Sequence, residues 1–262
     1  MNFRKHLGRS LLYSLILTGA ISTAQADTYD DGLMAFAVGN FQEAGRLFTK
    51  AAHDGHAGAE HMLMRLYSEG KLYAANGDAL HWTRQAAEHG FAQAQFALAE
   101  SYVSHGKAAA AVEWYRKAMA QGHHGAYYKL GLLLAEGAEG VPSNQAESRR
   151  LLGIAASEYD VFAQMGDPAA QTTLASMYEK AQGVRKDMNL AMQWYDRAAR
   201  QGFALAQLNL GRLYVYGDAG VPRDPQQATY WLDLAAAQGL REAKTLLGEL
   251  QGRDKAQIAM AL

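Results

Sequence analysis

Apolar residues recur along this chain with the period of an α-helix, and the same pattern returns six times. Each copy starts from a glycine, with an alanine four positions later and a leucine eight positions later. In most copies a tyrosine stands twelve positions after the glycine. Offsets of this size lie on one face of an α-helix, so each copy predicts a helix with a buried face, called helix A below. The six glycines are Gly55, Gly90, Gly122, Gly166, Gly202 and Gly239.

A second helix, called helix B, is predicted before each glycine. In four copies a tryptophan stands eight positions before the glycine, and an alanine stands three positions before that tryptophan. This spacing again follows one helix face, so the tryptophans are interpreted as core residues rather than as stacking platforms for sugars. Asp187 and Asp224, seven positions before their tryptophans, suit a helix N-cap, and Asn144 holds the matching place in a third copy. The residues predicted to be structural are Trp82, Trp114, Trp194, Trp231, Gly90, Gly122, Gly202 and Gly239.

One copy is longer than the others. Gly122 and Gly166 are 44 residues apart, whereas the other spacings run from 32 to 37. Leu151 takes the tryptophan position of this copy, 15 rather than eight positions before its glycine. The seven extra residues correspond to about two helical turns, so the simplest prediction is a helix B that is lengthened through residues 155–165. A small loop around 159–162 is the alternative, and in either form this copy is expected to protrude.

The N-terminus has the pattern of a secretory signal peptide. Three basic residues in MNFRKHLGR precede the apolar run LLYSLILTGAI, and STAQA follows with an Ala-x-Ala pattern ending at Ala26. The apolar run of 11 residues is shorter than the roughly 20 residues that a membrane-spanning helix needs. We therefore expect residues 1–26 to be removed after Ala26 and the rest to be exported to a periplasm, or alternatively secreted. An uncleaved amphipathic or membrane-anchoring helix is the alternative for residues 1–26.

Several stretches carry a resemblance to a known family. They include LGRLY at 210–214, YGDAGVPRD at 216–224 and AAAQG at 235–239. These stretches resemble the Sel1-like repeat family, a relative of the tetratricopeptide repeat. The resemblance implies an all-α fold, namely a right-handed superhelical solenoid of stacked helix-turn-helix repeats that binds other proteins. A single solenoid domain is then expected over 27–262, with repeats at about 29–55, 56–90, 91–122, 123–166, 167–202 and 203–239. Residues 240–262 are expected to form a C-terminal cap, with a further helix A and a short polar tail.

Composition and motifs exclude several classes of function. The net charge is −1 and no block of like charge occurs, which argues against a nucleic-acid site. The chain has no cysteine, so it has neither a disulfide nor an acylated cysteine as a membrane anchor. HExxH, Walker-type GxxxxGK[ST] and GxSxG motifs are absent. Eight histidines fall between residues 53 and 124, but their places at turns and helix ends indicate structural roles rather than a metal site. We predict no enzyme activity, no catalytic residue, no cofactor and no bound metal.

The remaining candidate site is a surface on the helices A. Offsets 6, 10 and 13 after each glycine are predicted to face outward, and large apolar residues gather there in two adjacent repeats. An apolar centre with a polar rim is the composition of a protein-binding surface. The alternative is that Phe96 and Tyr128 simply pack against the next repeat. The predicted partner-binding residues are His61, Arg65, Phe96, Glu100, Val103, Tyr128 and Leu132.

The functional prediction is a periplasmic, non-catalytic protein-binding scaffold or adaptor of the cell envelope. One alternative is an immunity protein that binds and neutralises a secreted antibacterial toxin, such as a phospholipase effector. Another is an accessory protein of exopolysaccharide secretion or of the flagellar motor. In each case the partner is another protein, and the chain is expected to be a monomer that does not insert into a membrane after signal cleavage.

Overall fold

The computed structural model describes residues 28–72, 78–218 and 220–261. The predicted signal peptide and its cleavage site lie outside these residues. The described part of the chain is helical, and apart from two isolated β-bridges it contains no β-structure. This confirms the all-α repeat fold. Within the ranges described, none of the helices combines the length and the apolar character that a membrane span requires.

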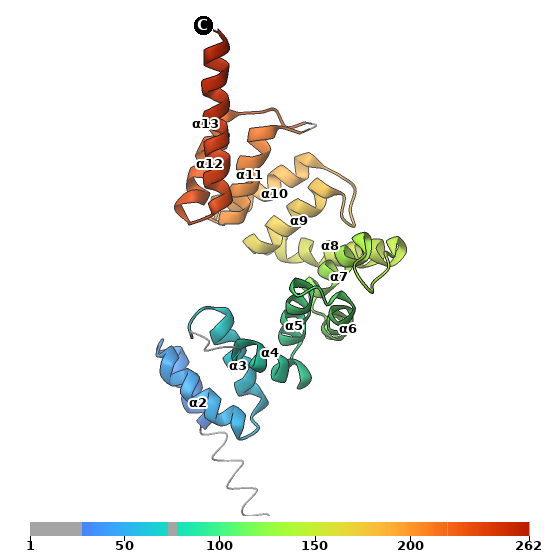
Figure 1. Cartoon of the computed structure of the whole chain (residues 1–262), viewed down its shortest axis with the longest axis vertical. Coiled ribbons are helices and arrows are strands. Elements are labelled where there is room, and N and C mark those ends of the chain that lie inside the picture. The colour runs from blue at the N-terminus through green and yellow to red at the C-terminus, as the bar shows by residue number, and fades with distance from the viewer. Residues whose placement is uncertain (1–27, 73–77, 219, 262) are drawn as a thin grey trace, which may run out of the picture. The chain divides into compact units, whose positions relative to one another are not determined.

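Within each of the chain's two compact units the helices follow one another in antiparallel pairs, and neighbours in chain order pack together (Figure 1). A helical segment over residues 28–37 precedes them. Their bounds are α2 Phe41–His53, α3 Ala57–Ser68, α4 Asp78–Glu88, α5 Ala92–Ser104, α6 Ala108–Met119, α7 His124–Glu136, α8 Gln145–Gln164, α9 Pro168–Lys180, α10 Met188–Arg200, α11 Ala204–Tyr216, α12 Pro225–Ala237 and α13 Arg241–Ala261.

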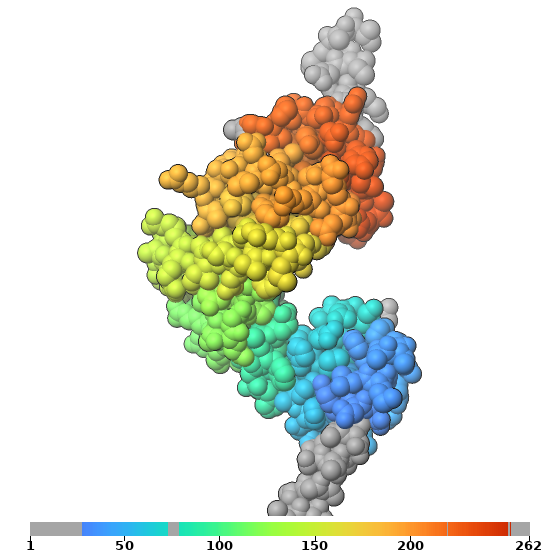
Figure 2. Space-filling model, turned by 180° about the vertical axis from the view of Figure 1, so that it is seen from behind, coloured from blue at the N-terminus to red at the C-terminus, as the bar shows by residue number. Residues whose placement is uncertain are grey.

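Contacts divide the chain into two compact units, an N-terminal unit that ends at Ala126 and a C-terminal unit that begins at Tyr127. Each is described by itself, and the expectation of one continuous solenoid domain stays a prediction. Side chains fill the space between the helices within each unit, and Figure 2 shows this for the C-terminal unit from yellow to red. The N-terminal core forms around Phe48, Leu63 and Leu98, and the C-terminal core around Leu174 and Leu210.

The six turn glycines are confirmed as backbone requirements of the repeat. Their φ angles lie between 78° and 97°, a region that side-chain-bearing residues rarely adopt. A Cβ built on any of them would meet no atom within 4 Å, so the backbone angle rather than crowding selects glycine. Each glycine reverses the chain between a helix B and the following helix A.

The predicted N-caps are confirmed. The side chain of Asp187 accepts a hydrogen bond from the backbone N–H of Leu190 at 2.9 Å. Asp224 caps α12 in the same way, and Asn144 caps α8. Asn144 is followed by one unbroken helix of 20 residues, so the seven extra residues lengthen helix B as predicted. The alternative of a loop around 159–162 is excluded.

Three of the four tryptophans are core residues as predicted, because Trp82, Trp194 and Trp231 are only 6–8% exposed. For Trp114 the prediction of a core position is wrong, because this side chain is only partly buried at the edge of a core cluster. The ammonium group of Lys117 lies 3.9 Å from its ring centroid. In the repeats of α6 and α10 the tyrosine after the tryptophan lies deeper, at 1% exposure. A helix that is covered from two sides buries two adjacent positions, and the tryptophan spacing alone marks only the first.

The C-terminal cap differs from its prediction. A short polar tail was expected after a further helix A, whereas α13 continues without a break over 21 residues. Gly248 and Gly252 stand inside this helix, and the sequence offers no proline that would end it earlier. Ala243, Leu246 and Leu250 bury its first turns against α11 and α12.

Candidate functional site

The predicted outward positions of helix A are covered more often than the sequence pattern suggested. In α11 these offsets carry Leu208 and Val215, which are 6% and 1% exposed. They belong to a core cluster that includes residues of α12 and α13. Each helix A inside a stack has its own helix B on one side and the next repeat on another, so its buried arc is wider than a two-helix contact predicts. The prediction that offsets 6 and 13 face outward is wrong for this repeat.

In the N-terminal unit, Phe96 and Glu100 serve repeat packing. The ring of Phe96 stacks on His123 with centroids 4.4 Å apart, and it also lies against Tyr115. Glu100 accepts a hydrogen bond from the hydroxyl of the buried Tyr115. Both contacts reach α6 and the turn that follows it, so the alternative interpretation of Phe96 is the one the geometry supports. Val103 is 39% exposed near the end of α5.

In the C-terminal unit, Tyr128 and Leu132 are half-buried on α7. The ring of Tyr128 meets Tyr159 edge to face at 5.9 Å, and its hydroxyl donates to the side-chain oxygen of Gln182 at 3.0 Å. Burial raises the pKa of Tyr128 above its ordinary value, and it raises the pKa of Tyr159 to about 12. Tyr128 therefore joins α7 to the lengthened part of α8. This agrees with the alternative interpretation, in which Tyr128 serves packing rather than partner binding.

His61 and Arg65 have a different setting, because both line a groove of about 490 Å³ between α3 and α5. Ser68, Glu69 and Gln93 complete its polar lining, and Ala97 provides a small apolar wall. Arg65 forms an exposed ion pair with Glu69 at 3.2 Å. The structure thus brings together two of the predicted partner-binding residues in one concave surface and assigns Phe96, Glu100 and Tyr128 to packing.

His61 gives this groove a neutral aromatic edge. Its ring stacks on Phe91 with centroids 5.0 Å apart, and its Nδ1 atom is buried without a hydrogen-bond partner. Burial lowers the pKa of His61, and the positive charge of Arg65 lowers it further. The groove therefore combines an uncharged imidazole with the exposed ion pair of Arg65 and Glu69.

A row of glutamines links successive repeats, and the sequence analysis did not detect it. The buried Gln171 donates to the carbonyl of Ala163 at 3.0 Å and accepts from Gln201 at 2.8 Å. The same two bonds recur with Gln95 and with Gln207. The sequence does contain this pattern. In each of these repeats one glutamine stands five positions after the turn glycine, and its partner stands one position before the next turn glycine.

The repeat of α3 and α4 replaces this amide pair by an ionisable pair. Glu60, 4% exposed, stands where the repeats of α5, α9 and α11 have the buried glutamine. The Nδ1 atom of His89 lies 2.5 Å from a carboxylate oxygen of Glu60, in place of the second glutamine. His89, read from the sequence as a helix-end residue, thus has a specific role in joining the two helices of its repeat.

The polar cluster around Glu179 connects α9, α10 and α11. Tyr195 donates to Glu179 at 2.8 Å, and Arg212 holds the other carboxylate oxygen at 2.5 Å. Burial and the Glu179 carboxylate raise the pKa of Tyr195 strongly, which keeps its hydroxyl protonated as a donor. Among the described residues, no group of three or more potential metal ligands lies together.

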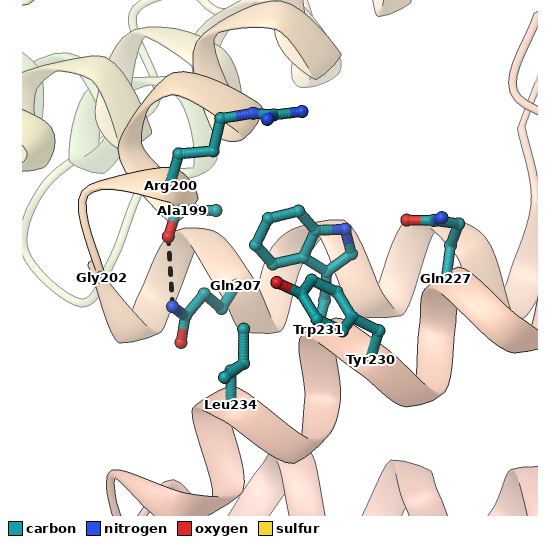
Figure 3. A pocket seen from close by; sticks show the side chains of 8 residues that line it. All are labelled: Ala199, Arg200, Gly202, Gln207, Gln227, Tyr230, Trp231 and Leu234. Carbon is teal, nitrogen blue, oxygen red and sulfur yellow. Dashed lines mark hydrogen bonds between the residues drawn. The ribbon is translucent and has the colours of Figure 1, made fainter.

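A second concave surface lies in the C-terminal unit, between the end of α10 and α12 (Figure 3). It has a volume of about 440 Å³. Its helical wall is one face of α12, formed by Gln227, Tyr230, Trp231 and Leu234. The opposite wall is the turn at residues 199–202, and its shape is supported by Gln207, which donates to the carbonyl of Ala199 at 3.1 Å.

Comparison with known proteins agrees with this architecture. The family described as Sel1 repeat matches residues 26–56, 65–91, 92–123, 124–160, 168–203 and 204–240. A Sel1 repeat protein from Oxalobacter formigenes is similar in structure, with a TM-score of 0.58 and 30% identity over 85% of this chain and 89% of that one. The type IV pilus biogenesis factor PilW shares the fold, with a TM-score of 0.55 and 15% identity over 86% of this chain and 98% of that one.

A curated relative matches only part of this chain. Chitin synthase regulatory factor 3 of Schizosaccharomyces pombe is 34% identical over 134 residues. The match spans 48% of this chain and 14% of that relative. This chain therefore resembles only a small part of that relative's length.

Proposed function

This chain belongs to the Sel1 repeat family, and we propose that it is a non-catalytic scaffold of the cell envelope that holds another protein. The family's repeats mediate protein–protein interaction. The observation that supports a binding role for this chain is the groove between α3 and α5, because it is a concave surface with side chains left available by the packing of the repeats. Repeat proteins of this architecture use such surfaces for extended contacts with a partner.

The chemistry of the groove suits a polypeptide segment. Gln93 and Ser68 can donate and accept hydrogen bonds, as a peptide backbone requires, and Arg65 offers a positive charge at the rim. The half-buried ring of His61 adds an apolar surface. A mixture of one aromatic, one arginine and adaptable polar groups resembles the centre of many protein interfaces.

Site-specific photo-crosslinking tests the groove. A photoreactive amino acid at Ser68, in the groove, is compared with one at the exposed Gln42 on α2. The proposal expects one envelope protein to be crosslinked from Ser68 but not from Gln42. Arg65→Ala should weaken that complex by about tenfold, whereas the matched variant Arg46→Ala on α2 should not.

The identity of the crosslinked protein separates the alternatives. A component of envelope assembly supports the scaffold, and a secreted toxin would favour the immunity function instead. No groove-specific crosslink, or equal crosslinking from both positions, would contradict binding at this groove.

Export is proposed from the N-terminal sequence. The protein isolated from an envelope fraction is expected to begin at Asp27, and N-terminal sequencing measures this directly. Recovery of the chain in the cytoplasm with Met1 intact would contradict the proposed location.

A further inference from the structure

The surface between α10 and α12 carries a second inference, which does not depend on the groove between α3 and α5. Large side chains protrude here although the core beneath is already filled. Tyr230 is 56% exposed and Leu234 is 37% exposed, while Trp231 below them is 6% exposed. Figure 3 shows these three side chains directed to the same pocket from α12.

The same positions in the repeats of α6 and α10 are polar. Three positions after their tryptophans, α6 and α10 carry Lys117 and Arg197, whose charged groups lie 3.9 and 4.5 Å from the ring centroids. In α12 this position is Leu234. One position before the tryptophan, Glu113 and Gln193 are replaced by Tyr230. In the last repeat, apolar side chains thus replace the polar side chains that surround the tryptophan in α6 and α10.

Apolar groups at these positions gain free energy only when another surface removes them from water. The small residues of the opposite wall, Ala199 and Gly202, leave the pocket open. Its walls are held in place, since Gln207 bonds both to Ala199 and to Gln238, which lies at the end of α12. An occupant would therefore meet a preformed site and order few additional side chains.

Arg200 determines the charge that the pocket favours. Its Nε atom donates to Asp196 at 2.7 Å, while its side chain remains 71% exposed. The hydrogen bond to Asp196 uses one of the five N–H groups of the guanidinium, so the others can bind a carboxylate from outside. Figure 3 shows Arg200 on the opposite side of the indole ring from Leu234. Gln227 and the hydroxyl of Tyr230 add uncharged hydrogen-bonding groups to the α12 wall.

We propose that this pocket binds a segment of a partner protein in which a bulky apolar side chain stands beside a carboxylate. The apolar side chain lies against Tyr230, Trp231 and Leu234, and the carboxylate pairs with Arg200. A sugar is less well matched, because the ring of Trp231 is almost fully buried and leaves little face for stacking.

Nuclear magnetic resonance of the full-length protein tests this proposal with two blocked dipeptides. The probes are N-acetyl-Phe-Asp-amide and N-acetyl-Phe-Lys-amide, which share the apolar side chain and differ in charge. The chain has four tryptophans, so the indole N–H signal of Trp231 can be assigned with single Trp→Phe variants. The Phe-Asp probe should shift this signal saturably, with a Kd on the order of millimolar, and the Phe-Lys probe should bind about tenfold more weakly.

Two variants test the two halves of the pocket. Leu234→Gln gives the residue type found at Gln85, three positions after Trp82, and removes apolar surface without adding charge, so it should weaken binding of the Phe-Asp probe by about tenfold. Leu80→Gln is its matched control, because Leu80 is 40% exposed in the N-terminal unit, and binding should be unchanged. Arg200→Glu changes an exposed position without touching the core, and it should reverse the preference between the two probes.

Equal binding of both dipeptides, or no saturable shift of the Trp231 signal, would overturn the proposal. A preference that Arg200→Glu fails to change would also overturn it. So would a saturable Trp231 shift caused by chitohexaose in the absence of a shift caused by the Phe-Asp probe, since that result would assign the pocket to a glycan.

Discussion

At the scale of single residues, four joints between the two helices of a repeat each depend on one buried polar side chain. Three joints use a glutamine that bonds forward and backward, and the joint between α3 and α4 uses the pair of Glu60 and His89. An amide pair is neutral at every pH, whereas a buried carboxylate needs a partner to remain charged. The first joint is therefore the one that a single substitution damages most.

The variant His89→Ala tests this joint. It leaves the Glu60 carboxylate buried without its partner, and we expect a loss of about 1–3 kcal/mol in the free energy of unfolding, measured by urea denaturation. The double variant Glu60→Gln with His89→Gln copies the other joints and should retain most of the wild-type stability. If His89→Ala unfolds at the same urea concentration as wild type, the pair contributes nothing to the joint.

His123 gives the N-terminal unit a predictable pH dependence. Its ring is stacked on Phe96 and its Nδ1 atom has no hydrogen-bond partner, so burial lowers its pKa, and the neighbouring His124 lowers it further. The unfolded chain then takes up a proton first as the pH falls below about 6.5. Stability contributed by neutral His123 is present above this pH and is lost as the pH falls below it.

The variant His123→Phe should reduce this pH dependence. Phe91 and Phe203 hold the same position after their turn glycines, so phenylalanine is expected to fit. The melting temperature of the variant should fall less than that of wild type between about pH 7.5 and pH 5.5. The part of the loss that comes from His61 should remain, because its pKa is also lowered by burial. Identical pH profiles for wild type and variant would show that His123 is protonated equally in the folded and the unfolded state, which would contradict this account.

At the scale of elements, α8 shows how a helix can be lengthened without losing its buried face. Ala155 and Ala163 are both fully or almost fully buried, although the extra residues lie between them. Seven residues make nearly two whole turns, so the buried stripe returns to the same side. The extension exposes Val161 and Met165 at 57% and 78%.

Deletion of residues 156–162 should restore an ordinary helix B. Ala155 would then precede Ala163 directly, as Ala198 precedes Ala199 in α10. We expect the variant to fold with native helicity and to lose about 1–3 kcal/mol, because the contact between Tyr159 and Tyr128 is removed. Deletion of residues 157–161 is the control, since five residues rotate the stripe by about 140° and should disrupt the packing far more. Equal stabilities of the two deletions, measured by circular dichroism during urea denaturation, would contradict this account.

At the scale of the whole molecule, contacts run between neighbours in the chain, so damage is expected to stay local. Trp194 lies in a core cluster of the C-terminal unit, with Ala170, Leu174 and Leu210. The variant Trp194→Ala should cost about 3–5 kcal/mol in that unit. Hydrogen exchange measured by mass spectrometry should accelerate in α9–α12 and stay unchanged in α2–α5. Uniform acceleration over the chain would show that the two units unfold as one.

The sequence by itself determined the helices, their buried stripes and their turns. A helical period is a local property, and a positive φ angle at a turn selects glycine wherever the turn occurs. For the same reason the N-caps at Asp187 and Asp224 and the lengthened helix before Gly166 could be predicted from spacing alone. The family resemblance depended on the same local features.

Only the tertiary structure decided which of the remaining positions are free to bind. Phe96 and Leu208 share one offset after their glycines and were expected outside, yet both are covered by the following helix or turn. The sequence shows that Leu234 stands at the position that Arg197 holds in α10. Only the packing shows that the pocket beside Trp231 is left open. Periodicity describes one helix face at a time, whereas exposure depends on every neighbour that packs against that helix, and those neighbours are set by the stacking of the repeats.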